Sequence, residues 1–263
     1  MDLGCNTFQL FIRNPRSLIQ SKPLDLNEVE IFKAKVCELD IRPIVVHANY
    51  LINMASQDTD KLKMSIESLA EEIERADKIG AEYVIVHPGH AKDVSKDEAC
   101  SIIARSIDTV LEMSNTKSTI CLENMSGMGS EVGSTFFELK EIINRSEFQH
   151  KIGICLDTCH AFAQGYDLRK NLGLDALLYD IDKEIGLSRL KVVHSNDCLF
   201  DCGLKKDRHT NLGRGKIGLD SFRKIVKRKE FSGLPFILET PDKEEGMQKR
   251  DVELLKSFLE DVK

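Results

Sequence analysis

The sequence alternates between short runs of aliphatic and β-branched residues and longer segments whose apolar residues recur at helical spacing. The short runs predict strands at residues 7–12, 43–47, 83–87, 119–123, 152–157, 191–194 and 236–239. The longer segments predict helices at residues 27–39, 59–79, 96–113, 135–146, 174–186, 219–228 and 244–261. Repeated units of one strand and one helix build either an open doubly wound sheet or a closed (β/α)8 barrel, so the fold class is α/β.

The barrel is the better fit of the two architectures. No GxGxxG follows the first strand and no GxxxxGKS or GxxxxGKT is present, so the usual markers of nucleotide-binding open sheets are missing. A length of 263 residues suits one TIM-type barrel domain, residues 1–263. A closed barrel needs about eight strands, whereas the pattern supplies seven and the chain opens almost directly into one. We therefore expect the first βα unit to be missing at the N-terminus.

Composition limits the classes of protein to which the chain can belong. The net charge of −6 argues against a wholly basic nucleic-acid coat but leaves local basic patches possible. No apolar run approaches the roughly 18 to 20 residues that span a bilayer, and no signal segment follows Met1. The eight cysteines form no CxxC pair, and we expect Cys155 and Cys159 to pack in the barrel rather than bind metal. These features predict a soluble, cytoplasmic monomer with no membrane partner.

Every expected strand after the first ends in a histidine or an acidic residue. These strand ends are His47, His87, Glu123, Asp157, His194 and Glu239. Any one of them alone is more often a loop residue or a satisfied polar group. In a parallel barrel, however, all six would meet at the C-terminal mouth, where the carboxylates would repel one another unless cations lay between them. The pattern therefore predicts a metal centre with zinc-like ligands.

Two local motifs extend this set of candidate ligands. Residues 153–160 end a strand in Asp157 and place His160 three residues further on. Asp207 and His209 are separated by one residue, so that in an extended segment both side chains point the same way. The candidates then number nine: His47, His87, Glu123, Asp157, His160, His194, Asp207, His209 and Glu239. Because one four-coordinate ion cannot use so many, two or three metals are expected.

Several segments also resemble a known family: residues 47–53, 87–89, 122–124, 153–160, 194–197 with 207–209, and 238–240. In collinear order over essentially the whole chain, they resemble the endonuclease IV family of apurinic/apyrimidinic (AP) endonucleases. The resemblance implies a (β/α)8 barrel with three zinc ions that acts in DNA base excision repair. It implies that a metal-bound hydroxide hydrolyses the phosphodiester 5′ to an abasic site in double-stranded DNA. The products would be a 3′-hydroxyl and a 5′-deoxyribose phosphate.

The resemblance also implies a role for each candidate ligand. By motif position, His47 and His87 would bind the first zinc ion, and Glu123 would bridge it to the second and act as the catalytic residue. The other ligands of the second ion would be Asp157, His194 and Glu239, and those of the third ion would be His160, Asp207 and His209.

DNA-contacting residues follow from the same resemblance. The family pushes side chains into the base stack and flips the abasic sugar into its pocket, and the matching positions are Arg16, Tyr50 and Leu51. The alternative is that Tyr50 and Leu51 simply pack their loop. Basic residues near the same mouth could contact phosphates: Arg13, Arg16, Arg169, Lys205, Lys206, Arg208, Arg214 and Lys216.

Two other functions stay open at the level of the sequence. One is a catalytically impaired relic of the same fold that binds damaged DNA. The other is a related metal-dependent sugar isomerase or epimerase, which shares His, Asp and Glu ligands at strand ends. The Asp207–His209 pair and the Tyr50–Leu51 tip count against the sugar enzyme, because a site with one or two metals requires neither.

Overall fold

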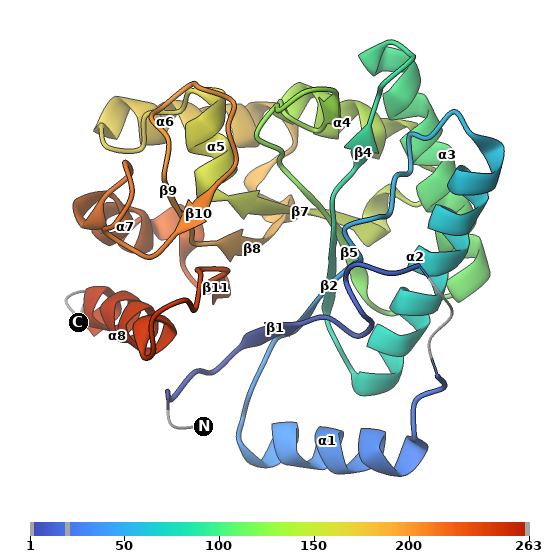
Figure 1. Ribbon diagram of the computed structural model, residues 1–263, viewed down its shortest axis with the longest axis horizontal. Coiled ribbons are helices and arrows are strands. Elements are labelled where there is room, and N and C mark those ends of the chain that lie inside the picture. Colours follow the sequence, from blue (N-terminus) through green and yellow to red (C-terminus); the bar gives the residue numbers. More distant parts are fainter. Residues whose placement is uncertain (1–2, 19–21, 261–263) are drawn as a thin grey trace.

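Seven parallel strands form the centre of the computed structural model, one for each strand expected from the sequence (Figure 1). The structure describes residues 3–18 and 22–260. The strands are β1 (Phe8–Leu10), β2 (Ile44–His47), β3 (Tyr83–Val86), β5 (Thr119–Glu123), β7 (Ile152–Asp157), β8 (Leu190–His194) and β11 (Phe236–Ile237). Their order in the sheet follows the chain and all their pairings are parallel, which confirms the expected TIM-type barrel.

Helices connect successive strands and surround the sheet (Figure 1). Those expected are α1 (Leu26–Glu38), α2 (Thr59–Ile79), α3 (Lys96–Ser114), α4 (Phe136–Arg145), α6 (Asn171–Glu184), α7 (Leu219–Val226) and α8 (Met247–Glu260). One more helix, α5 (Thr158–Gln164), follows β7 directly and was not expected. None of the helices in the described ranges has the length and apolar character needed to cross a bilayer.

Short strands and 3₁₀ helices lie in the segments that connect the main strands and helices. Strand β4 (Gly89–His90) pairs with β6 (Glu131–Val132), and β9 (Asp197–Cys198) pairs with β10 (His209–Thr210), both antiparallel. Three 3₁₀ helices, η1 (Gln149–Lys151), η2 (Leu187–Arg189) and η3 (Lys229–Phe231), precede β7, β8 and β11. The β9–β10 ribbon carries His209 back towards the strand ends.

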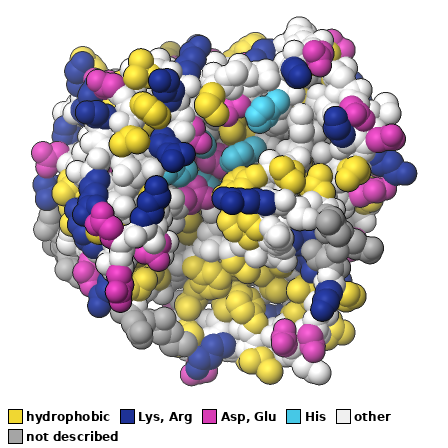
Figure 2. Space-filling view, viewed as in Figure 1, with side chains coloured by type: hydrophobic (Ala, Val, Ile, Leu, Met, Phe, Trp, Pro, Cys, Tyr) yellow, Lys and Arg dark blue, Asp and Glu magenta, His cyan; other side chains and the backbone are white. Residues whose placement is uncertain are grey.

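The sheet is nearly closed, and its two edge strands are β1 and β11. Within the described part of the chain, no strand lies between them, as the count of seven strands predicted. A cavity of about 580 Å³ opens there, lined by residues of both edges and of α8 that include Thr7, Phe236 and Leu255. Figure 2, which has the orientation of Figure 1, shows hydrophobic side chains gathered in the lower centre of the molecule. Helix α8 contacts the start of the chain, because Lys256 Nζ donates to the carbonyls of Leu3 and Gly4, both at 3.3 Å.

Side chains of the sheet form two separate cores. A small cluster fills the inside of the barrel: Val45, Ile85, Cys121, Cys155, Val192 and Ile237. A larger cluster packs the outer face of the sheet against the helices and includes Ile73 of α2. Since side chains alternate along a strand, the residue two positions after each inner residue also points inwards. Those residues are His47, His87, Glu123, Asp157, His194 and Glu239.

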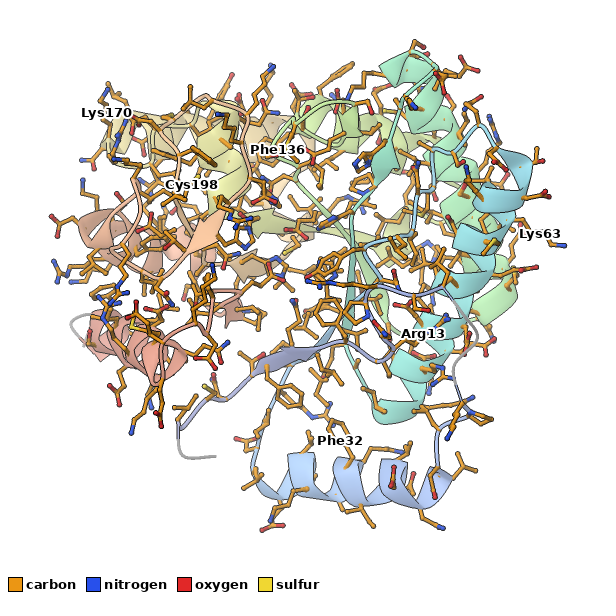
Figure 3. All side chains as sticks on the ribbon, in the orientation of Figure 1. Arg13, Phe32, Lys63, Phe136, Lys170 and Cys198 are labelled. Atoms are coloured by element: carbon orange, nitrogen blue, oxygen red, sulfur yellow. The ribbon has the colours of Figure 1, made fainter. Side chains whose placement is uncertain are left out.

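One basic residue offered above for phosphate contact is not available. The side chain of Arg13 is 2% exposed and lies beside α2, where Nη1 is 3.1 Å from Glu71 Oε2 and donates to Ser68 Oγ at 2.9 Å (Figure 3). The expectation that Arg13 faces the mouth was wrong. The sequence shows a basic residue in a polar turn, whereas the tertiary structure packs that turn onto the acidic side of a helix.

Candidate metal centre

The predicted ligands meet at the C-terminal end of the barrel. Four of them end a strand: His47, Glu123, Asp157 and His194. The other two of the six expected strand ends lie just outside, because β3 stops one residue before His87 and β11 stops two residues before Glu239. Histidine and acidic side chains lie together in a hollow of the face seen in Figure 2.

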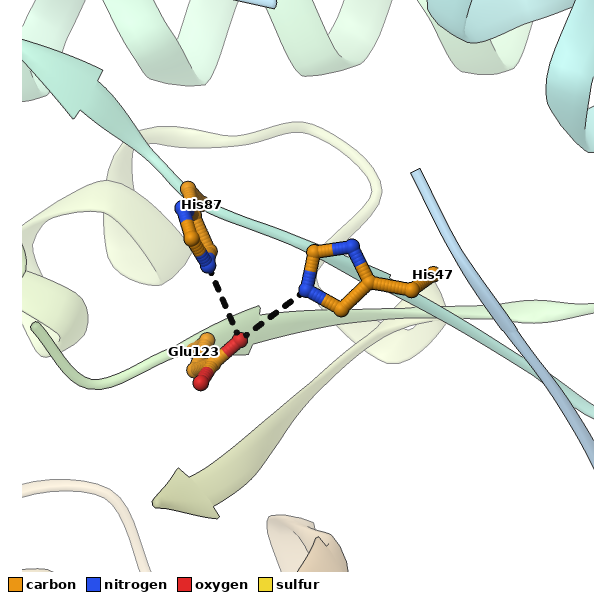
Figure 4. Close-up of side chains that lie close together, drawn as sticks. All are labelled: His47, His87 and Glu123. Atoms are coloured by element: carbon orange, nitrogen blue, oxygen red, sulfur yellow. Dashed lines mark ion pairs between the residues drawn. The ribbon is translucent and has the colours of Figure 1, made fainter. Parts of the chain in front are cut away.

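The first group of side chains consists of His47, His87 and Glu123 (Figure 4). The Nε2 atoms of the two histidines lie 3.4 Å and 3.3 Å from the same atom, Oε2 of Glu123. His47 and Glu123 are buried, whereas the side chain of His87 is 24% exposed. Three donor atoms therefore surround one point at the edge of the hollow.

The second group shares Glu123 and adds Asp157, His194 and Glu239. Nδ1 of His194 is 3.1 Å from Glu123 Oε1 and 3.2 Å from Glu239 Oε2. Asn196 orients the two acids, because its Nδ2 donates to Asp157 Oδ2 at 2.6 Å and to Glu239 Oε2 at 3.3 Å. The two carboxylate oxygens of Glu123 thus face different groups, which is the arrangement of a bridging ligand.

The third group consists of His160, Asp207 and His209. His160 lies on α5, and Asp157 caps that helix by accepting a hydrogen bond from the backbone N–H of His160 at 2.8 Å. This cap turns the histidine towards Asp207, whose Oδ2 is 3.2 Å from His160 Nε2. His209 Nε2 is also 3.2 Å from Asp207 Oδ1. Cys159 is close enough to Asp157 and His209 to form a fourth candidate group.

The chemistry of these donors fits divalent cations. Nδ1 of His47 donates to the carbonyl of Ala48 at 2.7 Å, and Nδ1 of His160 donates to that of Asn124 at 2.8 Å. Because a carbonyl only accepts, the proton of each neutral ring lies on Nδ1. In that form the lone pair is on Nε2, which is the state of a metal-binding histidine. Five buried side-chain atoms lack a hydrogen-bond partner among the described residues, and three of them belong to candidate ligands: Glu123 Oε2, His160 Nε2 and His209 Nε2. Buried polar atoms are normally paired, and zinc-like ions take this donor set.

Electrostatics favour the same conclusion. Burial alone would lower the pKa of His160, but nearby carboxylates, above all Asp157, raise that pKa well above its usual value. The same competition raises the pKa of His209 to about 9. Burial would raise the pKa of Glu123, yet the histidines around it, His194 foremost, hold that pKa well below its usual range. The site attracts positive charge, and a divalent ion would displace the protons that otherwise supply it.

The residues expected to contact DNA lie at the rim of this hollow. Tyr50 and Leu51 are 47% and 52% exposed, and Arg16 is exposed in the turn after β1. The Tyr50 ring packs on the rings of His47 and Phe11, with both centroid distances at 5.2 Å. Burial, followed by the charges of the nearby acids, raises the pKa of Tyr50 to about 12. The tyrosine therefore covers the first group as a neutral hydroxyl-bearing ring, while Leu51 projects from the loop.

Asn49 joins the two loops that carry these residues, and the sequence motifs did not single it out. Its Nδ2 donates to the carbonyls of Asn14 and Ser17 at 2.7 and 2.8 Å, and its Oδ1 accepts from the backbone N–H of Leu51 at 2.8 Å. Its own N–H donates to Glu72 Oε2 at 3.0 Å. The turn after β1 and the loop after β2 are thus one hydrogen-bonded unit.

Other basic residues near the mouth are engaged with acids. Arg169 pairs with Asp167 at 2.6 Å and with Asp201 at 3.0 Å, and Arg214 pairs with Glu244 at 2.9 Å. These three acids reduce the positive charge that the two arginines would offer to phosphates.

Residues 1–258 match the family described as xylose isomerase-like TIM barrel. The chain is 40% identical over 259 residues to the probable endonuclease 4 of Halothermothrix orenii, covering 98% of this chain and 92% of the relative. The crystal structure of endonuclease IV from Thermus thermophilus superposes with a TM-score of 0.88 at 31% identity, covering 99% of this chain and 91% of that chain. The chain belongs to the endonuclease IV family.

Membership of the endonuclease IV family confirms the resemblance carried by the sequence motifs. A D-tagatose 3-epimerase-like protein also superposes, with a TM-score of 0.74, but at 22% identity over 98% of this chain and 89% of that chain. At that identity the likeness shows a shared barrel and nothing about the reaction. The sugar-enzyme alternative therefore has the fold in its favour, whereas the endonuclease IV family has the sequence as well.

Proposed function

We propose that this chain is a zinc-dependent AP endonuclease of DNA base excision repair. It would hydrolyse the phosphodiester 5′ to an abasic site in double-stranded DNA, leaving a 3′-hydroxyl and a 5′-deoxyribose phosphate. The observation that carries the proposal is the convergence of nine donor side chains, in three groups, at the mouth of an endonuclease IV-family barrel.

Each group would hold one zinc ion, three per chain. The first ion would lie between His47, His87 and Glu123, and the other ligand sets would be Glu123 with Asp157, His194 and Glu239, and His160 with Asp207 and His209. When bound, these ions supply positive charge against the phosphate oxygens and make water acidic enough to attack near neutral pH. Cys159 is left out, because a hydrogen bond with Cys198, followed by burial, raises the pKa of its thiol, which opposes the thiolate form that binds metal.

Glu123 would set the spacing of the reacting groups. It is 1% exposed, and it ends β5, which lies in the middle of the sheet with β3 paired on one side and β7 on the other. One carboxylate oxygen faces His47 and His87, and the other lies 3.1 Å from His194. A rigid bridge of this kind fixes the first and second groups relative to each other, which is the catalytic contribution we assign to this residue.

The rim would recognise the missing base. An abasic site offers no base edge to read, so a protein must test whether the stack at that position is filled. Leu51 and Tyr50 present partly apolar side chains beside the hollow, and Arg16 lies near enough to Tyr50 for its charge to act on the pKa of the hydroxyl. We propose that these three residues enter the duplex or contact its backbone when the abasic sugar swings into the hollow.

Incision of a defined duplex tests this function. The purified protein should cut a duplex with one abasic site, leave the matched undamaged duplex intact, and contain two to three zinc ions per chain. Strong chelation should abolish the cutting and added Zn²⁺ should restore it. Glu123→Gln, which retains the shape of the side chain but not its charge, should remove most of the activity and so exclude a contaminating nuclease.

The same preparation separates the alternatives. Full activity in metal-free protein would contradict the proposal. Tight binding of the abasic duplex without incision, in the presence of zinc, would support the impaired DNA-binding relic. Conversion of a ketose such as D-tagatose without any action on DNA would support the sugar epimerase.

A further inference from the structure

A predicted ligand ends or closely follows each strand of the sheet except β1, whose inward-facing residue is Gln9. The register of the sheet pairs Gln9 with Val45 of β2. Val45 belongs to the cluster inside the barrel, and residues paired across parallel strands point to the same face. Gln9 therefore points into the barrel, just below the level of His47.

The carboxamide of Gln9 contacts two ligands of the second group. Its Nε2 donates to Oε1 of Glu239 at 2.7 Å. Its Oε1 lies 2.8 Å from Nε2 of His194, and because an amide oxygen only accepts, the imidazole N–H donates there. Glu239 follows β11, and His194 ends β8, so one side chain links the edge strand β1 to the opposite end of the sheet.

These two bonds occupy the outer atom of each ligand. They leave Nδ1 of His194 and Oε2 of Glu239 facing each other at 3.2 Å, with Nδ1 also 3.1 Å from Glu123 Oε1. Gln9 holds one proton on Nε2 of His194. Without a metal, Nδ1 also carries a proton, which it donates to Glu123 Oε1. An ion in the second group would replace the proton on Nδ1 and leave the one on Nε2 in place. A hydrogen bond to the outer nitrogen is the usual way in which proteins set the tautomer and the direction of a metal-binding histidine.

We propose that Gln9 is a positioning residue for the second metal group. It selects the Nε2–H tautomer of His194 and turns Oε2 of Glu239 towards the same point, while it ties the two edge strands of the open barrel across the site. The inference rests on the metal centre proposed above and adds a residue that touches no ion itself. Its function is to raise the affinity of one ion out of three.

Gln9→Met tests this role, because methionine has nearly the same length and volume but neither hydrogen bond. The affinity of the wild type and the variant for Zn²⁺ is measured by competition with a chromogenic chelator, with metal content counted on the same samples. We expect one zinc ion to bind about 10- to 100-fold more weakly and the remaining ions to be unaffected. Equal weakening of all the ions, or no weakening, would overturn the proposal.

Thr7→Val is the matched control. It removes one hydrogen bond from the same edge strand, that from Thr7 Oγ1 to the carbonyl of Pro43 at 2.6 Å, but touches no ligand. Its zinc affinities should equal those of the wild type. If Thr7→Val lost the same ion as Gln9→Met, the effect would belong to the packing of β1, and the assignment to Gln9 would be wrong.

A measurement on the wild type does not depend on the folding of any variant. Long-range proton–nitrogen NMR of the zinc-loaded protein should show His194 protonated on Nε2 and metal-bound through Nδ1. The opposite tautomer would overturn the proposal. Incision of abasic DNA is assayed separately, so a protein that fails to cut DNA would refute the proposed function while the zinc affinities still decide the role of Gln9.

Discussion

Glu72 of α2 offers the most quantitative prediction, because it is a buried acid outside the metal centre. Its side chain is 1% exposed, Oε2 accepts the N–H of Asn49 at 3.0 Å, and the nearest cation, Nη1 of Arg13, is 3.9 Å from Oε1. Burial outweighs both partners and raises the pKa of Glu72 to about 7, against an ordinary value of 4.5. The folded protein therefore keeps a proton that the unfolded chain has already lost.

The sign of the effect follows from proton linkage. Between about pH 4.5 and pH 7 the folded state holds more protons than the unfolded state, so raising the pH through this window destabilises the fold. A difference of about 2.5 pH units at about 1.4 kcal/mol each gives a penalty of about 3.5 kcal/mol above pH 7. Glu72→Gln can still accept the hydrogen bond from Asn49 but carries no such penalty. Between pH 4.5 and pH 8, the free energy of unfolding of the variant should therefore rise by about 3.5 kcal/mol relative to that of the wild type.

Urea unfolding at half-unit steps from pH 4.5 to pH 8, with the same metal content in both proteins, measures this change. Taking the difference between variant and wild type removes the titration of the metal ligands, which both share. Glu67→Gln, an exposed position on the same helix, is the control and should show a constant offset from the wild type. A constant offset for Glu72→Gln as well would refute the reasoning, since it would mean that Glu72 is ionised in the fold throughout.

Three further predictions concern the loops and the metal centre. Asn49→Ala removes the side-chain hydrogen bonds that join the two rim loops, at a cost of about 1–2 kcal/mol in stability. The variant should show a KM for abasic duplex raised roughly 10-fold, with kcat and zinc content unchanged. A lowered kcat with an unchanged KM in steady-state kinetics would contradict this prediction. Gly215→Ala places a Cβ against the carboxylate of Asp197 and the carbonyl of Cys198, and should cost about 1–3 kcal/mol in thermal unfolding; an unchanged melting temperature would contradict it. Zinc uptake at pH 7.5 should release protons, because the surrounding acids raise the pKa of His209 to about 9 in the metal-free protein. The affinity for Zn²⁺ should therefore rise with pH up to about that value. Calorimetric heats of zinc binding that do not depend on the buffer would contradict this prediction.

Much of the barrel could be predicted from the sequence because the signal is local. A strand alternates with a period of two, so the position of Val45 inside the barrel already places His47 inside, and the same step relates Cys121 to Glu123. The stripe of apolar residues over 59–79 predicted α2 with its observed bounds. The C-terminal ends of parallel strands meet in any barrel, and so the convergence of their last residues follows from topology alone.

Other features depend on partners distant in the chain. Helix α5 is seven residues long and directly follows a buried strand, so its sequence is too short to show a helical periodicity of apolar residues. The hydrogen bond by which Asp157 caps the helix at His160 forms only once the strand has ended. Arg13 was expected at the rim and is buried, because its acids lie 58 and 59 residues away on α2.

By itself, the sequence determined the fold class, the family and the identity of the nine candidate ligands, because those depend on short-range periodicity and on motifs in order along the chain. Only the tertiary structure decided how the donors divide into groups, which oxygen of Glu123 faces which group, and that Gln9 holds the outer atoms of His194 and Glu239. The physical reason is range. Hydrogen bonds and charges act over a few ångströms in space. Gln9 is separated along the chain from His194 by 185 positions and from Glu239 by 230, and it comes within that distance of them only when the sheet has curled into a barrel.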